Sequence, residues 1–142
     1  MSEMSNYLEA ALIDTLFRSG GNFTAPADIY IGLATATLSD ASTGASMSEQ
    51  TGTAYARVDT GGPLDGAWDD PGATSGATAN TSAVTFTAAG AGDWTDVTDM
   101  AILNAVTSGD LLFYTPLTVT PVAIGDGDTP NFAAGAITIT LA

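Results

Sequence analysis

The chain has 142 residues, of which 16 are acidic and two are basic, so its formal net charge is −14. Binding to nucleic-acid phosphates needs lysine and arginine to displace counterions, and an acidic membrane surface repels a chain of this sign. Neither nucleic acid nor a membrane is therefore an expected partner. Cysteine and histidine are absent, which excludes a disulfide framework, a thiolate metal site and a histidine base.

Length and composition predict one domain, residues 1–142, with a mainly β fold. The chain contains 16 glycines and many short apolar runs, a pattern typical of short strands joined by tight turns. We expect a β-sandwich of about six to seven strands over residues 28–142, preceded by one N-terminal amphipathic helix at residues 6–18.

The helix at 6–18 is the first expected element. Asn6 is placed to cap it with Glu9 as the reciprocal partner three residues later, and Gly20-Gly21 is placed to end it. A broad apolar stripe follows one side of this helix and includes Leu8, Leu12 and Leu16. Such a stripe packs on the chain's own sheet or on a neighbouring subunit. We expect these leucines to line a homo-oligomer or capsid interface.

Residues 28–36 alternate in a way that predicts the first strand. The small and polar residues 37–53 predict a long exposed loop with an acidic tip at Glu49. Residues 55–59 predict a short strand, in which Arg57 is expected to form an ion pair with a nearby aspartate.

Residues 60–82 predict a long structureless loop, and such loops are usually functional or mobile. The loop carries Trp68, which either contacts a partner or folds back to plug the edge of the domain. If the loop meets a host surface, Trp68 and Tyr55 would stack on sugars, and Asp65 and Asp69 would accept hydrogen bonds from hydroxyl groups. Trp68 and Tyr55 are accordingly candidate interface residues.

The stretch 92–116 holds the largest concentration of apolar residues and predicts the central hairpin of the core. Ile102 lies in its first strand and the run 111–114 forms its second. A short polar break with a glycine separates the two strands. The remaining expected strands are 83–87 and 136–141, and residues 118–132 are expected to form a connection.

No constellation in the sequence predicts catalysis. The run Gly125-Asp126-Gly127-Asp128 contains oxygen ligands suited to calcium, but Asp126 and Asp128 also suit a tight turn, and we favour the turn. A serine nucleophile would lack both a histidine and a lysine partner. We therefore expect no enzyme activity, no catalytic residue, no cofactor and no metal site.

Several segments together resemble a family of small virion proteins of tailed bacteriophages. The segments are MSNYLEAALIDTLFR at 4–18, DIYIGLATA at 28–36, YARV at 55–58, NTSAVTF at 80–86, GDWTDVTDMAI at 92–102, GDLLFYTPL at 109–117 and NFAAGAITITL at 131–141. The chain departs from the family pattern at Leu103-Asn104 and in the inserted loop around Trp68.

The resemblance implies a virion protein, located on the outer surface of the capsid or in the tail. Our preferred hypothesis is a capsid decoration or cement protein that binds the major capsid protein and copies of itself, as a trimer, and stabilises the head. The alternative is a tail-fibre or tail-associated module, either structural or receptor-binding. Its partners would be other tail proteins or a host surface glycan.

Overall fold

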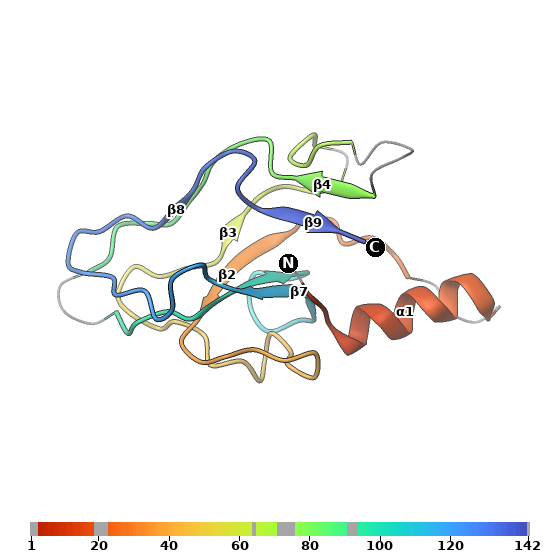
Figure 1. Ribbon diagram of the computed structural model, residues 1–142, viewed down its shortest axis with the longest axis horizontal. Helices are drawn as coiled ribbons and strands as arrows, with labels where there is room; N and C mark the ends of the chain where they lie inside the picture. Colours follow the sequence, from red (N-terminus) through yellow and green to blue (C-terminus); the bar gives the residue numbers. More distant parts are fainter. Residues whose placement is uncertain (1–2, 19–22, 64, 71–75, 91–93, 142) are drawn as a thin grey trace.

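The computed structural model describes residues 3–18, 23–63, 65–70, 76–90 and 94–141. Within these ranges the chain forms one α-helix and nine strands, arranged as one five-stranded sheet and two two-stranded sheets. Figure 1 shows the helix projecting from one end of the β-structure. The prediction of a mainly β fold with one N-terminal helix is confirmed.

The elements pair as follows. The five-stranded sheet has the order β1 (Glu3–Met4), β7 (Leu111–Pro116), β6 (Asp99–Leu103), β2 (Tyr30–Ala34) and β3 (Val58–Asp59). The small sheets pair β4 (Ala77–Ala79) with β9 (Thr138–Thr140), and β5 (Val84–Thr85) with β8 (Asn131–Phe132). Every one of these pairs is antiparallel. The helix α1 spans Asn6–Phe17.

The predicted central hairpin is the pair β6–β7. All five residues of β6 are buried, because the sheet is covered on both faces. Ile102 lies opposite Phe113, and the register shifts between Ile102 and Leu103. The turn that joins the strands places Ser108 and Gly109 at φ values of 50° and 72°, a region that glycine adopts without strain.

Two hydrophobic clusters cover the two faces of the five-stranded sheet. On one face, residues of β2, β6 and β7 pack against Val84 and Ile139 of the small sheets and against Phe86 and Ile137, which flank the strands of those sheets; we call this the main cluster. On the other face, Leu38 and Met47 pack against Leu103 and Leu111. Residues 37–53 thus form a loop layered over the sheet: many of them are exposed, as expected, but Leu38 and Met47 are buried against the sheet. Glu49 is not the exposed tip that was expected, because it is bound by Arg57.

Arg57 fixes this layer to the sheet. Its guanidinium donates to both carboxylate oxygens of Glu49, at 2.8 Å from Nε and 2.7 Å from Nη2, and Nη1 donates to the carbonyls of Ala105 and Ser108. The expected ion-pair partner was an aspartate, and the observed partner is Glu49. At Gly44 an added Cβ would lie 2.0 Å from the Ser108 carbonyl oxygen, so the layer approaches the turn too closely for any other residue.

Other differences from the sequence-based expectations concern short strands. The strand expected at 55–59 forms only at Val58–Asp59, and the segment expected to be a structureless loop, 60–82, contains β4. The expected connection 118–132 ends in β8. Strands of two or three residues are too short to show a periodic pattern in a sequence.

Candidate functional site

The base of α1 is anchored to the sheet by its N-cap. The cap is Ser5, one residue earlier than the predicted Asn6, and its Oγ accepts a hydrogen bond from the Leu8 amide at 3.3 Å. The same hydroxyl donates to the carbonyl of Leu111 in β7. Ser5 is completely buried, so one side chain both starts the helix and ties it to the central hairpin.

The strand β1 reinforces this anchor. The helix was expected to precede every strand, but Glu3 and Met4 pair with Tyr114 and Phe113 of β7 before the helix begins. The Tyr114 hydroxyl donates to the Glu3 carboxylate at 2.8 Å. Burial, followed by this hydrogen bond, raises the pKa of Tyr114 to about 12. The direction in which α1 leaves the sheet is therefore fixed on both sides of Ser5.

The predicted leucine stripe divides along the helix. Leu8 is 4% exposed and belongs to the main cluster, and Leu12 is partly buried against the same cluster. Leu16 is 73% exposed and its neighbour Phe17 is 80% exposed, because the helix continues beyond the edge of the sheets. Of the three candidate leucines, Leu8 is buried, Leu12 is partly buried and only Leu16 is exposed.

The exposed end of the helix combines apolar groups with one cation. We call Ile13, Leu16, Phe17 and Arg18 the helix tip; Arg18 is the C-cap residue. The Arg18 guanidinium lies 3.3 Å from the Asp14 carboxylate, and both groups are exposed, so this pair contributes little to stability. Gly20-Gly21, expected to end the helix, lies outside the described residues.

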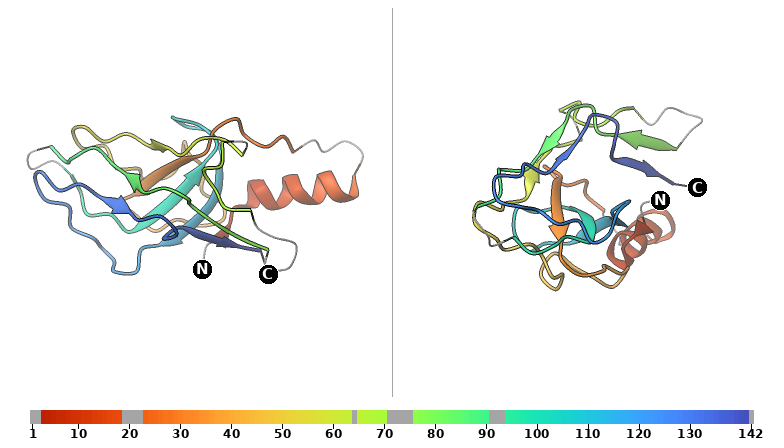
Figure 2. Two further views of the ribbon diagram at one scale, coloured as in Figure 1. Left: turned by 90° about the horizontal axis from the view of Figure 1, so that it is seen from above. Right: turned by 60° about the vertical axis from the view of Figure 1, so that its left-hand side comes forward.

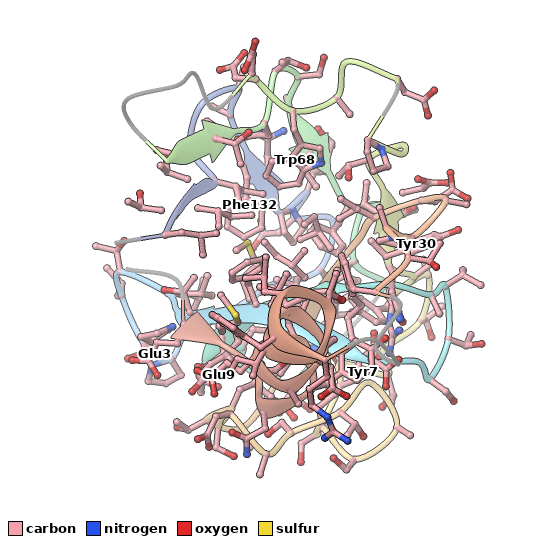
Figure 3. All side chains as sticks on the ribbon, turned by 90° about the vertical axis from the view of Figure 1, so that its right-hand side faces the viewer. Glu3, Tyr7, Glu9, Tyr30, Trp68 and Phe132 are labelled. Carbon is pink, nitrogen blue, oxygen red and sulfur yellow. The ribbon has the colours of Figure 1, made fainter. Side chains whose placement is uncertain are left out.

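A second apolar surface opens between the five-stranded sheet and the pair β4–β9. This groove has a volume of about 560 Å³ and is lined chiefly by apolar side chains, including Ile29, Trp68, Phe113, Ile139 and Leu141. Asp69 lies on its lining and is exposed. In Figure 3 the helix points toward the viewer, and Trp68 lies above it beside the β4–β9 pair. We call this surface the apolar groove.

Trp68 is half-buried and packs against the main cluster. Its backbone forms a bridge with Asn80, which accounts for the expected fold-back onto the domain edge. Its indole Nε1 is buried and has no hydrogen-bond partner among the described residues. A buried donor left in this state is costly, and it usually indicates that a partner group is missing.

Tyr55 lies in a different environment from Trp68. Its ring stacks on that of Phe86, with 6.0 Å between the ring centroids, and meets the Trp94 ring edge-on, with 5.5 Å between the centroids. Its hydroxyl accepts from the Leu33 amide and donates to Glu49, each at 2.9 Å. Burial raises the pKa of Tyr55 well above its usual range. This side chain is used within the fold, and the structure does not present it with Trp68 as a platform for a sugar.

The acidic candidates mainly complete turns. Asp65 accepts a hydrogen bond from the Gly62 amide at 2.9 Å, and Asp128 accepts one from the Gly125 amide at 2.7 Å. The run at 125–128 therefore forms the tight turn that its residues favour. Within the described ranges, no three acidic side chains gather in a way that could hold a metal ion.

The sequence of this chain matches the family model described as podophage GP4 fiber I protein gp80, over residues 3–140. The chain belongs to this family. The resemblance to virion proteins of tailed phages is thereby confirmed, and the family description supports a fibre-like structural role. Comparison with curated proteins finds no match. No helix in the described part of the chain has the length and hydropathy of a membrane span.

The helix tip and the apolar groove are the two apolar surfaces that the geometry leaves open to another molecule. The sequence singled out Leu16 and Trp68, one from each surface. It missed Phe17 as an exposed group and missed Phe113 and Leu141 as groove residues. In the expected strand 136–141, Leu141 shares a face with Ile137 and Ile139; these two are buried, whereas Leu141 lies at the rim of the groove and is 54% exposed.

Proposed function

We propose that this protein is a structural subunit of the phage fibre, and that it assembles with copies of itself through the helix tip. One observation carries the proposal: Leu16 and Phe17 are 73% and 80% exposed at the end of a projecting helix whose base is locked to the sheet. Large exposed apolar side chains grouped at one place are typical of interaction sites. The family description supports a fibre in preference to the capsid surface.

The tip itself is tested by the double variant Leu16→Ser/Phe17→Ser. We expect it to lose self-association, measured by sedimentation velocity, while the melting temperature and the near-ultraviolet circular dichroism of the monomer stay unchanged. Leu12 is left intact because it packs on the chain's own core. The matched control is Ala10→Ser, an exposed position in the base half of the helix, and it should assemble like the unmodified chain. A double variant that still assembles would contradict the role of the tip.

The place in the virion is tested on intact particles with a gold-labelled antibody. Label on the fibres, at a small copy number per particle, supports the proposal. Label spread over the head in hundreds of copies would support the capsid decoration hypothesis, with the major capsid protein as partner, and would overturn the proposal.

A further inference from the structure

We propose that the helix tip of one copy docks into the apolar groove of a second copy, so that each chain carries both the donor and the acceptor of one contact. This inference rests on the proposed function, since it names the partner surface for the helix tip. Three independent features of the two surfaces match: their apolar side chains, their hydrogen-bonding groups and their charges.

The apolar match is the first feature. The tip presents Ile13, Leu16 and Phe17, which are 57%, 73% and 80% exposed, and nothing in the described part of the same chain covers them. The groove offers an apolar recess of about 560 Å³, lined by two aromatic rings, Trp68 and Phe113, and by aliphatic side chains. Docking would remove both surfaces from water, which is the main driving force of protein association.

The hydrogen-bond match is the second feature. Trp68 lines the groove, and its indole Nε1–H is buried and lacks an acceptor among the described residues. The last turn of an α-helix leaves carbonyl groups without partners inside the helix. A docked helix end brings the type of group that the indole lacks, and a turn of the Trp68 ring toward the groove would join the two; an apolar ligand such as a lipid chain offers no acceptor.

The charge match is the third feature. Two copies of a chain with net charge −14 repel each other, so a contact between them is favoured where it pairs a cation with an anion. The chain has two arginines and no lysine, and Arg57 is buried against Glu49. Arg18 is thus the only exposed basic side chain. It lies in the tip, while the exposed Asp69 lies on the groove lining.

The geometry requires a second copy as the source of the tip. The helix is fixed at its base by Ser5 and β1, and its 12 residues carry the tip about 18 Å from that anchor. Figures 1 and 2 show α1 directed away from the sheets, so the tip does not turn back toward its own groove. Because donor and acceptor are different surfaces, the contact is heterologous and generates either a closed ring or an open chain. The expected trimer would be a ring of three.

The test uses one variant of each surface. Leu16→Ser/Phe17→Ser removes the donor, and Leu141→Asp places a charge at the rim of the acceptor. Each variant alone should be monomeric by sedimentation velocity. An equimolar mixture should form a one-to-one heterodimer and nothing larger, because one intact tip and one intact groove remain. The matched control is Val106→Asp, an apolar-to-acidic change at a position 58% exposed and away from the groove lining; it should assemble like the unmodified chain.

The outcomes separate the inference from the function on which it rests. If the donor variant is monomeric but Leu141→Asp assembles normally, the groove is not the acceptor and the proposed function survives. If both variants are monomeric but their mixture forms no heterodimer, docking of the tip in the groove is also overturned. If the unmodified chain is monomeric at every concentration tested, or the donor variant assembles normally, the proposed function itself fails.

A second variant tests the hydrogen bond and does not depend on a new charge. Trp68→Phe keeps an aromatic ring in the groove and removes the indole donor together with part of the ring. We expect self-association to weaken about tenfold, the usual effect of losing one hydrogen bond. A modest loss of monomer stability is expected as well, because Trp68 packs against the main cluster. An unchanged association constant would contradict the assigned role of Trp68.

Discussion

The base and the tip of α1 belong to one continuous helix but have opposite surroundings. At the base, Ser5 is fully buried and Leu8 is 4% exposed, and both are fixed to β7 or to the main cluster. At the tip, Leu16 and Phe17 are apolar but lie in solvent. The sequence pattern is the same along the whole helix, so the difference comes from where the sheets end. An amphipathic stripe that is longer than the surface beneath it leaves its last residues available for another molecule.

The largest expected difference between the two ends is in the free energy of unfolding. Leu8→Ala should lower it by about 2–5 kcal/mol, because it leaves a cavity in the main cluster. Leu16→Ala should change it by less than about 0.5 kcal/mol in the monomer, since the side chain is exposed. Urea unfolding of the two variants measures both values. Similar losses at both positions would show that the tip also packs within its own chain.

A second comparison between the base and the tip of the helix uses single hydroxyl groups, that of the N-cap Ser5 and that of Thr15. Ser5→Ala should lower the free energy of unfolding by about 0.5–2 kcal/mol, because the Leu8 amide loses its acceptor. Thr15→Val is the counterpart near the tip, where the hydroxyl donates to the Ala11 carbonyl and accepts from the Phe23 amide, both at exposed sites. Water can replace both hydrogen bonds there, so the effect should stay within about 0.5 kcal/mol. Thermal unfolding by circular dichroism compares the two, and a larger effect at Thr15 would reverse the assignment of base and tip.

Alkaline pH should weaken the base of the helix, together with the buried site around Tyr55, whose pKa is also raised. The folded-state pKa of Tyr114 is raised from 10.0 to about 12, so its contribution is fully present below pH 10. The contribution is lost as the pH rises from about 10 to 12, because the unfolded chain ionises first. The melting temperature should therefore fall steeply in this window, and less steeply in Tyr114→Phe. The pKa values of Tyr7 and Tyr55 are raised as well, but both residues are present in the two proteins, so the difference between the two pH profiles reports Tyr114 alone. An identical pH profile for Tyr114→Phe and the unmodified chain would argue against this role.

The smallest expected effect is that of salt on the monomer. Added sodium chloride should raise the melting temperature of the Leu16→Ser/Phe17→Ser monomer, because ions screen the mutual repulsion of 16 acidic residues. The exposed pair Arg18–Asp14 weakens at the same time but contributes little. A melting temperature that falls between low salt and moderate salt would show that attractive ion pairs, such as Arg57–Glu49, dominate instead.

The sequence was sufficient for the elements with strong local patterns. The helix ends one residue before the predicted boundary, and the hairpin β6–β7 and the strand β2 lie where their alternation places them. Ser5 as the N-cap was not chosen because Asn6 is an equally good capping residue; the difference is made by a hydrogen bond to Leu111, which is distant in the sequence.

The residues of the candidate site were harder to predict from the sequence. The apolar groove is formed by segments that come together only through the pairing of β4 with β9, and both strands have three residues. No local signal places Trp68 beside Leu141. Likewise, residues 37–53 are mostly small and polar, and only Leu38 and Met47 indicate that the segment covers a sheet face. Both the groove and the packing of residues 37–53 depend on contacts between segments that are distant in the sequence, and a local pattern does not reveal such contacts.

The two arginines also determine where trypsin can cleave this protein. Trypsin cleaves after lysine and arginine, and the chain offers only Arg18 and Arg57. Arg57 is 7% exposed and bound on several sides, whereas Arg18 is exposed and extended at the C-cap, with φ −131° and ψ 131°. Brief digestion of the folded monomer should therefore cut once, after residue 18, and leave fragment 1–18 held to the β-structure by β1, Ser5 and Leu8. A tip buried against a partner would be protected, so the rate of this single cut reports the occupancy of the contact.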